Sequence, residues 1–220
     1  MNKLFFILAF LSQNVFAADD VGRVKLVLPQ GEWVTDSKID TPLVYGGDSL
    51  GSISSQRLVK VLVNDKIIQA LLFVSAGDHG LTKGHMEWSD RCKQKKSEYR
   101  VDATNGSFTR LDCLRVYRSM QPAEWLKKYA QKTYDELTQS GYTFASNGYQ
   151  ITHKIGTDNG TFIFSNMLIA RSVLAGIPSA KKGATYAGMP GVAWGHQYAD
   201  AARSSVTSLS GELVMPAVSY

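Results

Sequence analysis

The sequence predicts an α+β protein in which a mostly antiparallel sheet is built from hairpins, with two amphipathic helices packed on one face. Three observations support this fold class. Strand-like apolar segments occur in pairs around short turn sequences, two longer segments have helical periodicity, and no regular strand–helix alternation suggests a parallel sheet. We expect residues 18–220 to form a single domain, because no repeat or low-complexity linker divides them.

The first 17 residues have the layout of a cleaved export signal. Lys3 supplies a short positive region, and Leu4–Leu11 is an unbroken run of eight apolar residues. Val15 and Ala17 are the small residues expected at the −3 and −1 positions of a signal-peptidase cut. The run is well short of the roughly 20 residues that a spanning helix needs. We therefore expect a signal peptide, and a soluble mature chain in the periplasm or the extracellular space.

Apolar alternation predicts the first strands. Val21–Leu28 alternates apolar residues with small or charged ones, and Glu32–Thr35 has a shorter pattern of the same kind. Arg57–Val63 and Lys66–Val74 are rich in Val and Leu and flank Asn64-Asp65, two residues that tolerate the positive φ of a hairpin turn. The sequence therefore predicts a hairpin here.

Two further hairpins follow the same logic, since paired strand-like segments again flank turn residues. The predicted strand pairs are Tyr99–Ala103 with Phe108–Tyr117, around Asn105-Gly106, and Tyr149–Ile155 with Thr161–Ala170, around Asp158-Asn159-Gly160. Asn-Gly is the strongest short hairpin signal.

The two predicted helices are Pro122–Ser140 and Trp194–Ser210. Pro122 suits the first helical position, and Gly141 suits the position just after the helix end. Most apolar residues of each segment share one side, which favours a face packed against the core.

The two cysteines are predicted to form one disulfide. Cys92 and Cys113 both lie in the exported part, and an oxidising compartment favours pairing. Closing a loop of this size would stabilise the fold by roughly 3 kcal/mol. Because Cys92 lies in a polar stretch and Cys113 in a strand-like one, the bridge should pin a loop to the sheet.

Charge and motif content exclude several functions. The formal net charge is +5, falling to +4 without Lys3, and the basic residues are scattered rather than gathered in a module. We therefore predict no nucleic-acid partner. No cofactor fingerprint is present, so we expect no cofactor, and no later apolar stretch is long enough for an integral membrane segment.

One block suggests chemistry. Gly47–Gly51 reads GDSLG, which matches the GxSxG pattern of a nucleophile elbow and follows the strand-like Leu43–Tyr45. Its first four residues resemble the block of the GDSL hydrolases, a resemblance that implies Ser49 as the nucleophile of a secreted esterase. The family's C-terminal DxxH does not occur here, and its fold is a parallel α/β sandwich. His153 and His196 are the available bases. A Gly-rich turn is the competing interpretation.

Another cluster offers candidate metal ligands. Asp78, His79, His85 and Glu87 lie within ten residues, but their spacing is irregular and differs from rigid patterns such as HExxH. We expect a polar loop tethered by Cys92 rather than a metal site.

The sequence as a whole favours a non-catalytic binding or accessory module of the cell envelope over an enzyme, because no complete triad or cofactor motif is present. The long segments at 77–92 and 178–190 are the expected contact regions. Their candidate binding residues are Trp88, Lys181, Lys182 and Tyr186. The expected partner is another envelope protein or a small ligand.

Overall fold

The structure is a computed structural model that describes residues 18–44, 52–81, 85–88, 92–93, 98–104, 107–174, 189–208 and 211–219. Residues 1–17, Ser49, Lys181, Lys182 and Tyr186, which carry several of the sequence predictions, lie outside the described residues.

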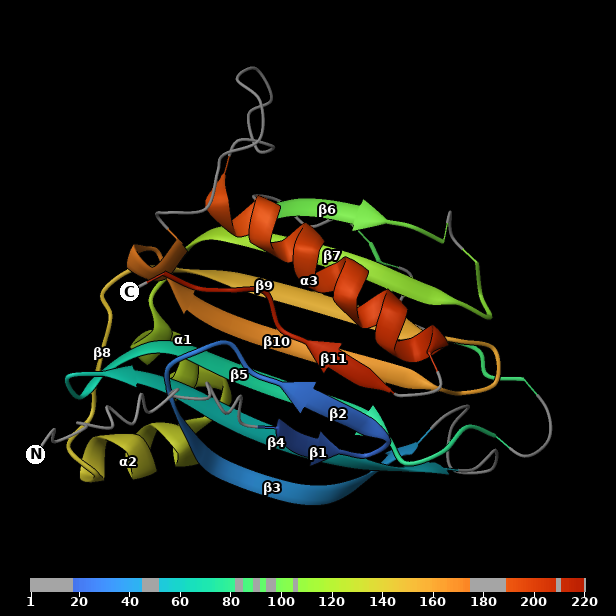
Figure 1. Ribbon diagram of the computed structural model, residues 1–220, viewed down its shortest axis with the longest axis horizontal. Coiled ribbons are helices and arrows are strands. Elements are labelled where there is room, and N and C mark those ends of the chain that lie inside the picture. Colours follow the sequence, from blue (N-terminus) through green and yellow to red (C-terminus); the bar gives the residue numbers. More distant parts are fainter. Residues whose placement is uncertain are drawn as a thin grey trace, which may run out of the picture.

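A large sheet forms the centre of the molecule (Figure 1). Its strands are β3 (Glu32–Val44), β4 (Ser52–Asn64), β5 (Ile67–Gly77), β6 (Glu98–Asp102), β7 (Leu111–Met120), β8 (Thr143–Phe144), β9 (Gly148–Gly156) and β10 (Phe162–Ala170). They run in the order β3-β4-β5-β10-β9-β7-β6 with antiparallel pairing, and β8 pairs in parallel with β5. The three predicted hairpins are confirmed as β4–β5, β6–β7 and β9–β10.

A small second sheet lies over one face of the large one. It consists of β1 (Ala18–Val21), β2 (Val24–Val27) and β11 (Glu212–Val214), in the order β1-β2-β11. The expectation of a single strand over Val21–Leu28 is wrong, because the chain turns back at Gly22, whose φ is 54°. A Cβ at Gly22 would lie 2.6 Å from the carbonyl oxygens of Ala76 and Gly77, so only glycine fits this turn.

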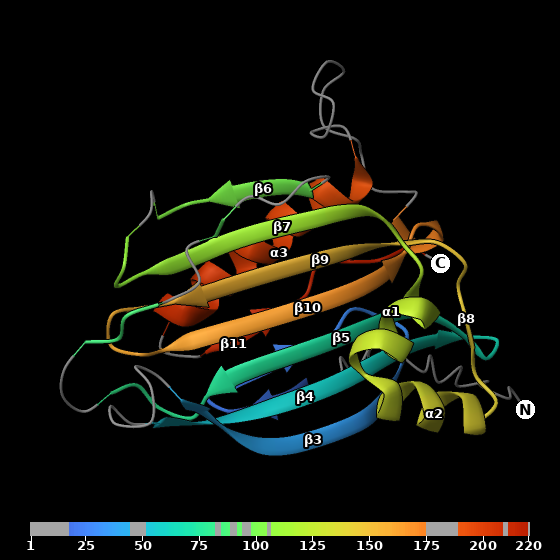
Figure 2. The ribbon, with the colours of Figure 1, turned by 180° about the vertical axis from the view of Figure 1, so that it is seen from behind.

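The helices cover opposite faces of the large sheet (Figures 1 and 2). The first predicted helix is interrupted at Ala130, whose φ is −151°, and becomes α1 (Pro122–Tyr129) and α2 (Gln131–Gln139). The second is α3 (Pro190–Thr207), which contacts β7, β9 and β10, and a 3-10 turn forms at Ser172–Leu174. The α+β class with a mostly antiparallel sheet is confirmed, whereas the expectation of both helices on one face is wrong.

Two-sided burial of the central strands explains this arrangement. On β5, Leu72 and Val74 pack into the core beneath Trp194 of α3, while Leu71 and Phe73 pack on the other side with Leu126 of α1. A strand that is apolar on both faces needs a cover on each side. The α1–α2 pair covers only one end of its face (Figure 2).

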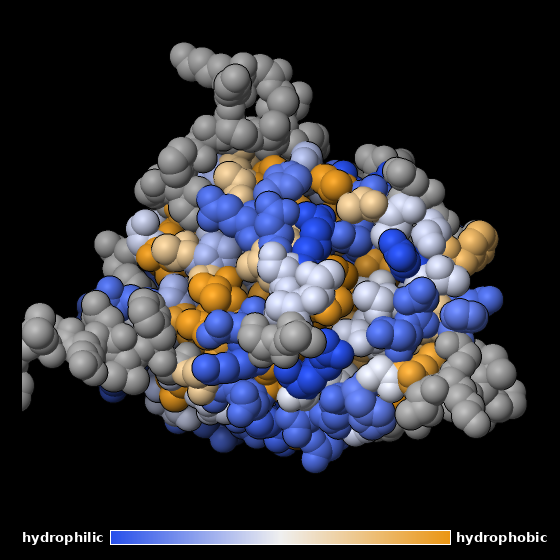
Figure 3. Space-filling model, turned by 45° about the vertical axis from the view of Figure 1, so that its right-hand side comes forward, coloured by the Kyte–Doolittle hydropathy of each residue, from blue (hydrophilic) through white to orange (hydrophobic). Residues whose placement is uncertain are grey.

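The outer surface is mixed in polarity. On the side shown in Figure 3, hydrophobic residues are scattered among hydrophilic ones. No helix in the described part of the chain is both long and apolar enough to cross a bilayer.

Candidate functional site

A groove opens on the sheet face that α1 and α2 cover only in part. Its volume is about 200 Å³. We call it the open-face groove, and its lining residues are Arg57 of β4, Phe73 and Ser75 of β5, Trp125 of α1, Thr152 and Lys154 of β9, and Phe164, Ser165 and Asn166 of β10.

Strand register brings these residues together. Arg57 pairs with Ser75, Ser75 with Phe164, and Phe164 with Lys154, which makes one row across four strands. In the neighbouring row, Phe73 pairs with Asn166, and Asn166 with Thr152. Because alternate residues of a strand point to the same face, both rows present their side chains to the groove.

Two cations lie over aromatic rings in the groove. The guanidinium carbon of Arg57 is 5.4 Å from the centroid of Phe73, and Nζ of Lys154 is 5.5 Å from that of Phe164. Both distances suit a cation–π interaction. Among the described residues no carboxylate forms an ion pair with Arg57, and none of the lining residues is acidic. Arg57 therefore brings positive charge to the described part of the groove.

Polar donors lie between the cations. Oδ1 of Asn166 accepts hydrogen bonds from Nε2 of Gln150 at 3.0 Å and from Oγ1 of Thr152 at 3.3 Å. These two bonds orient the amide, so that Nδ2 of Asn166 remains as a donor. The hydroxyl of Ser75 lies in the same row as Arg57.

Aromatic residues form the wall next to α1. The ring centroids of Trp125 and Phe73 are 5.6 Å apart, and those of Trp125 and Tyr129 are 5.2 Å apart. Tyr129 is 62% exposed, so the aromatic wall continues from the groove onto the outer surface of α1.

At the end of the groove away from α1, Trp88 packs from inside the core against Phe164. The indole is only 6% exposed, its Nε1 donates to the carbonyl oxygen of Thr157 at 3.2 Å, and its ring lies 5.6 Å from that of Phe164. A Cβ on Gly156 would lie 2.5 Å from the indole, so the ring packs flush on the strand. The sequence suggested Trp88 as a surface contact, but the structure places it in the core.

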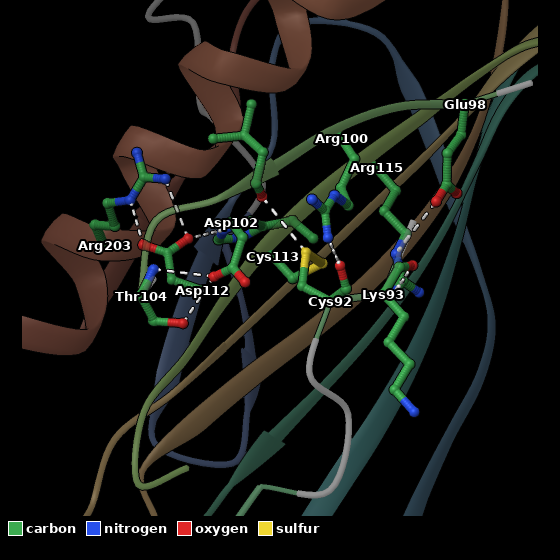
Figure 4. Close-up of a disulfide and its surroundings, with 12 residues drawn as sticks. Cys92, Lys93, Glu98, Arg100, Asp102, Thr104, Asp112, Cys113, Arg115 and Arg203 are labelled. Atoms are coloured by element: carbon green, nitrogen blue, oxygen red, sulfur yellow. Dashed lines mark hydrogen bonds and ion pairs between the residues drawn. A yellow bond between two sulfur atoms is a disulfide. The ribbon is translucent and has the colours of Figure 1, made fainter. Parts of the chain in front are cut away.

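The disulfide holds the segment that follows Trp88. Cys92 is joined to Cys113 of β7, with their Cα atoms 5.5 Å apart, so the bridge pins a loop to the sheet as predicted (Figure 4). Two arginines reinforce it: Arg100 donates to the carbonyl oxygen of Cys92, and Nη2 of Arg115 donates to that of Lys93 at 3.3 Å.

A second polar cluster lies beneath α3, on the opposite face of the sheet. His153 is fully buried, and its Nε2 lies 3.0 Å from Oδ1 of Asp112. Nε of Arg203 donates to Oδ2 of the same carboxylate at 2.6 Å. Burial lowers the pKa of His153 below its usual value, and the hydrogen bond to Asp112 offsets this only in part. Burial alone would raise the pKa of Asp112, but hydrogen bonds from His153 and Arg203 hold it below its usual value.

The imidazole of His153, one of the two candidate bases, has no exposed surface. The other candidate base, His196, has its Nε2 2.8 Å from the hydroxyl of Tyr99. Ser49 lies outside the described residues, so its role as a nucleophile stays a prediction.

The candidate metal ligands His79, His85 and Glu87 are exposed. Within the described ranges, no group of three or more His, Cys, Asp and Glu side chains is arranged to hold a metal ion.

No protein-family model, curated protein or solved structure matches this chain. The sequence did not predict the open-face groove. The signal available was weak: Thr152 and Lys154 alternate with buried residues on β9, which indicates a strand face without full cover.

Proposed function

We propose that this protein is a non-catalytic binding module of the cell envelope and that the open-face groove holds its ligand. One observation carries the proposal: a cavity of about 200 Å³ in which aromatic rings and several polar donors converge. Ligand sites commonly combine apolar walls with a few placed polar groups that fix orientation. The rigid strands beneath the groove would hold these groups in place.

The composition of the groove supports binding over catalysis. Its described lining residues include neither a carboxylate nor an imidazole, the side chains that most often act as a general base. Of the two serines that line it, Ser165 bonds through its hydroxyl to Tyr198. Ser75 has no adjacent histidine in either strand row.

The proposal is tested by a ligand-observed NMR screen with small carboxylates, phosphates, amines and neutral aromatic compounds. We expect some compounds to bind the wild type and to lose binding in Ser75→Trp, because an indole would fill the groove. Ser204→Trp, an equal change at an exposed position of α3, is the matched control and should keep them. The proposal fails if no compound binds, or if Ser75→Trp binds as the wild type does.

Export is part of the proposal. It is supported by the signal-like first 17 residues and by the disulfide, which is typical of an oxidising compartment.

A serine hydrolase is the alternative, and the GDSLG block is the observation that favours it. This alternative predicts covalent labelling by a fluorophosphonate probe that is lost in Ser49→Ala. If the wild type is not labelled, or if labelling survives the substitution, the hydrolase alternative is excluded.

A further inference from the structure

We infer that the ligand of the open-face groove is an organic anion: a carboxylate, phosphate or sulfate group attached to a flat, apolar ring system. This inference rests on the proposed function and names the class of ligand.

The two cations lean toward the centre of the groove. Arg57 on β4 covers Phe73 of β5, and Lys154 on β9 covers Phe164 of β10. Since β5 and β10 are the two strands between β4 and β9, each cation reaches inward over a neighbouring strand. An anion between them would meet the positive charge of Arg57 on one side and the ammonium of Lys154 on the other, and no acidic residue of the described lining would repel it; Arg57, which has no ion pair among the described residues, carries the larger share of the argument.

The groups around this position suit an oxyanion. A guanidinium has several N–H donors in a planar fork, which matches the two oxygens of a carboxylate or phosphate. The guanidinium of Arg57 lies over the ring of Phe73, and no hydrogen bond or ion pair among the described residues uses its N–H donors. The hydroxyl of Ser75 and Nδ2 of Asn166 add neutral donors on the floor between the cations.

The aromatic wall indicates that the body attached to the anionic group is flat and apolar. Trp125 stands between Phe73 in the groove and the exposed Tyr129, so a flat body has ring surface to stack on from the floor to the outside of α1. A cavity of about 150 Å³ is enough for benzene. The groove, at about 200 Å³, therefore has room for one ring with its charged group, and a larger body would extend over Trp125.

The test compares naphthalene probes of matched shape by isothermal titration calorimetry: 2-naphthoate, 2-naphthyl phosphate, the neutral 2-naphthamide and the cationic 2-naphthylmethylamine. We expect at least one anion to bind about tenfold more tightly than the amide, which corresponds to a gain of one charge-assisted contact. Whichever anion binds more tightly identifies the head group. Higher salt should weaken the anions most.

Variants then locate the charge preference. Arg57→Gln and Lys154→Gln should each reduce the preference for the anion over the amide several-fold, while Arg57→Lys should keep part of it. Lys38→Gln, which removes an exposed charge on β3, is the control and should change nothing. Melting temperatures of all variants show whether each one is folded.

The possible failures are distinct. If the amide or the amine binds as tightly as the anions and Ser75→Trp abolishes it, the groove is a binding site but the anion inference is wrong. If the anions bind regardless of Arg57, Lys154 and Ser75, they bind elsewhere and the inference is again wrong. If no naphthalene probe binds while the wider screen finds other groove ligands, the inferred class is wrong and the proposed function stands.

Discussion

Lys60 is a charged residue inside the core, only 5% exposed, and its partners make this possible. Its Nζ lies 2.6 Å from Oδ2 of Asp19 on β1 and donates to Oγ1 of Thr35 on β3 at 2.6 Å. A buried ammonium is tolerated when it is paired and hydrogen-bonded. This contact ties the small sheet to the large one.

Removing the counter-ion should therefore destabilise the protein. Asp19→Asn leaves Lys60 buried without its charge partner, which we expect to cost about 2 kcal/mol, less than for a fully buried pair because Asp19 is partly exposed. Urea denaturation measures the loss. Glu124→Gln, which disrupts the exposed pair with Lys127, is the control and should cost much less, because an exposed ion pair contributes little to stability. Equal effects of the two variants would contradict a special role for Lys60.

We expect His153 to make the stability of the fold depend on pH. Its pKa is lowered in the folded protein, so the unfolded chain takes up a proton at a higher pH than the folded one does. Stability should therefore be full above the usual pKa of 6.5 and should fall as the pH drops below it, by up to about 1.4 kcal/mol per pH unit. The groups that face the imidazole are Asp112 of β7 and, from α3, Asp200, Arg203 and Tyr198.

Urea midpoints from pH 8 to pH 3 test this. We expect His153→Phe to flatten the slope between pH 6.5 and 5, because the titrating group is gone. Below about pH 4 the variant should also lose stability, since Arg203 still lowers the pKa of Asp112 and the unfolded chain therefore takes up this proton first. A wild-type slope unchanged by His153→Phe would assign it to other groups.

At the scale of elements, the hairpins were predictable because turn chemistry and alternation are both local. The β4–β5 turn differs only in detail: Asp65 and Lys66 have φ of 48° and 61°, one residue beyond the predicted pair. The interruption of the helix at Ala130 was not predictable, because alanine is the best helix former. Tertiary packing outweighs propensity here, since Leu126 of α1 and Leu137 of α2 are both buried in the same core cluster.

The close contact between Trp88 and β9 depends on the glycine at position 156. Gly156→Ala would place a methyl 2.5 Å from the indole, and the overpacking should cost about 1–3 kcal/mol. Gly195→Ala on α3 is the matched control: its nearest neighbour would lie 3.3 Å away, and better helix propensity offsets the tight contact. Thermal unfolding compares them. If both variants lose equal stability, flush packing of Trp88 is not what requires Gly156.

At the scale of the whole molecule, the open-face groove could not be predicted. Its residues come from β4, β5, β9, β10 and α1, and they meet only because β10 pairs with β5. That pairing joins segments about 90 residues apart, and no local pattern encodes it. The sequence also could not predict which face of the sheet each helix covers, because a strand that is apolar on both faces is compatible with either helix on either face.

The N-terminal strand links the export prediction to the stability of the whole fold. The expected cut after Ala17 falls immediately before β1, and within β1 Asp19 pairs with Lys60 and Val21 is fully buried. We therefore expect the intact mass of protein isolated from its host to match residues 18–220 with one disulfide. A cut beyond Asp19 would remove the counter-ion of Lys60, so a mature protein of that length would contradict the role given to this strand.

A variant separates processing from folding in the same experiment. Ala17→Phe places a bulky residue where signal peptidase requires a small one, so the uncleaved chain should accumulate. The strand itself is unchanged, and the accumulated chain should keep the stability that Asp19→Asn loses. If Ala17→Phe is processed like the wild type, the cut lies elsewhere. If the wild type retains residues 1–17, the segment is not a cleaved signal.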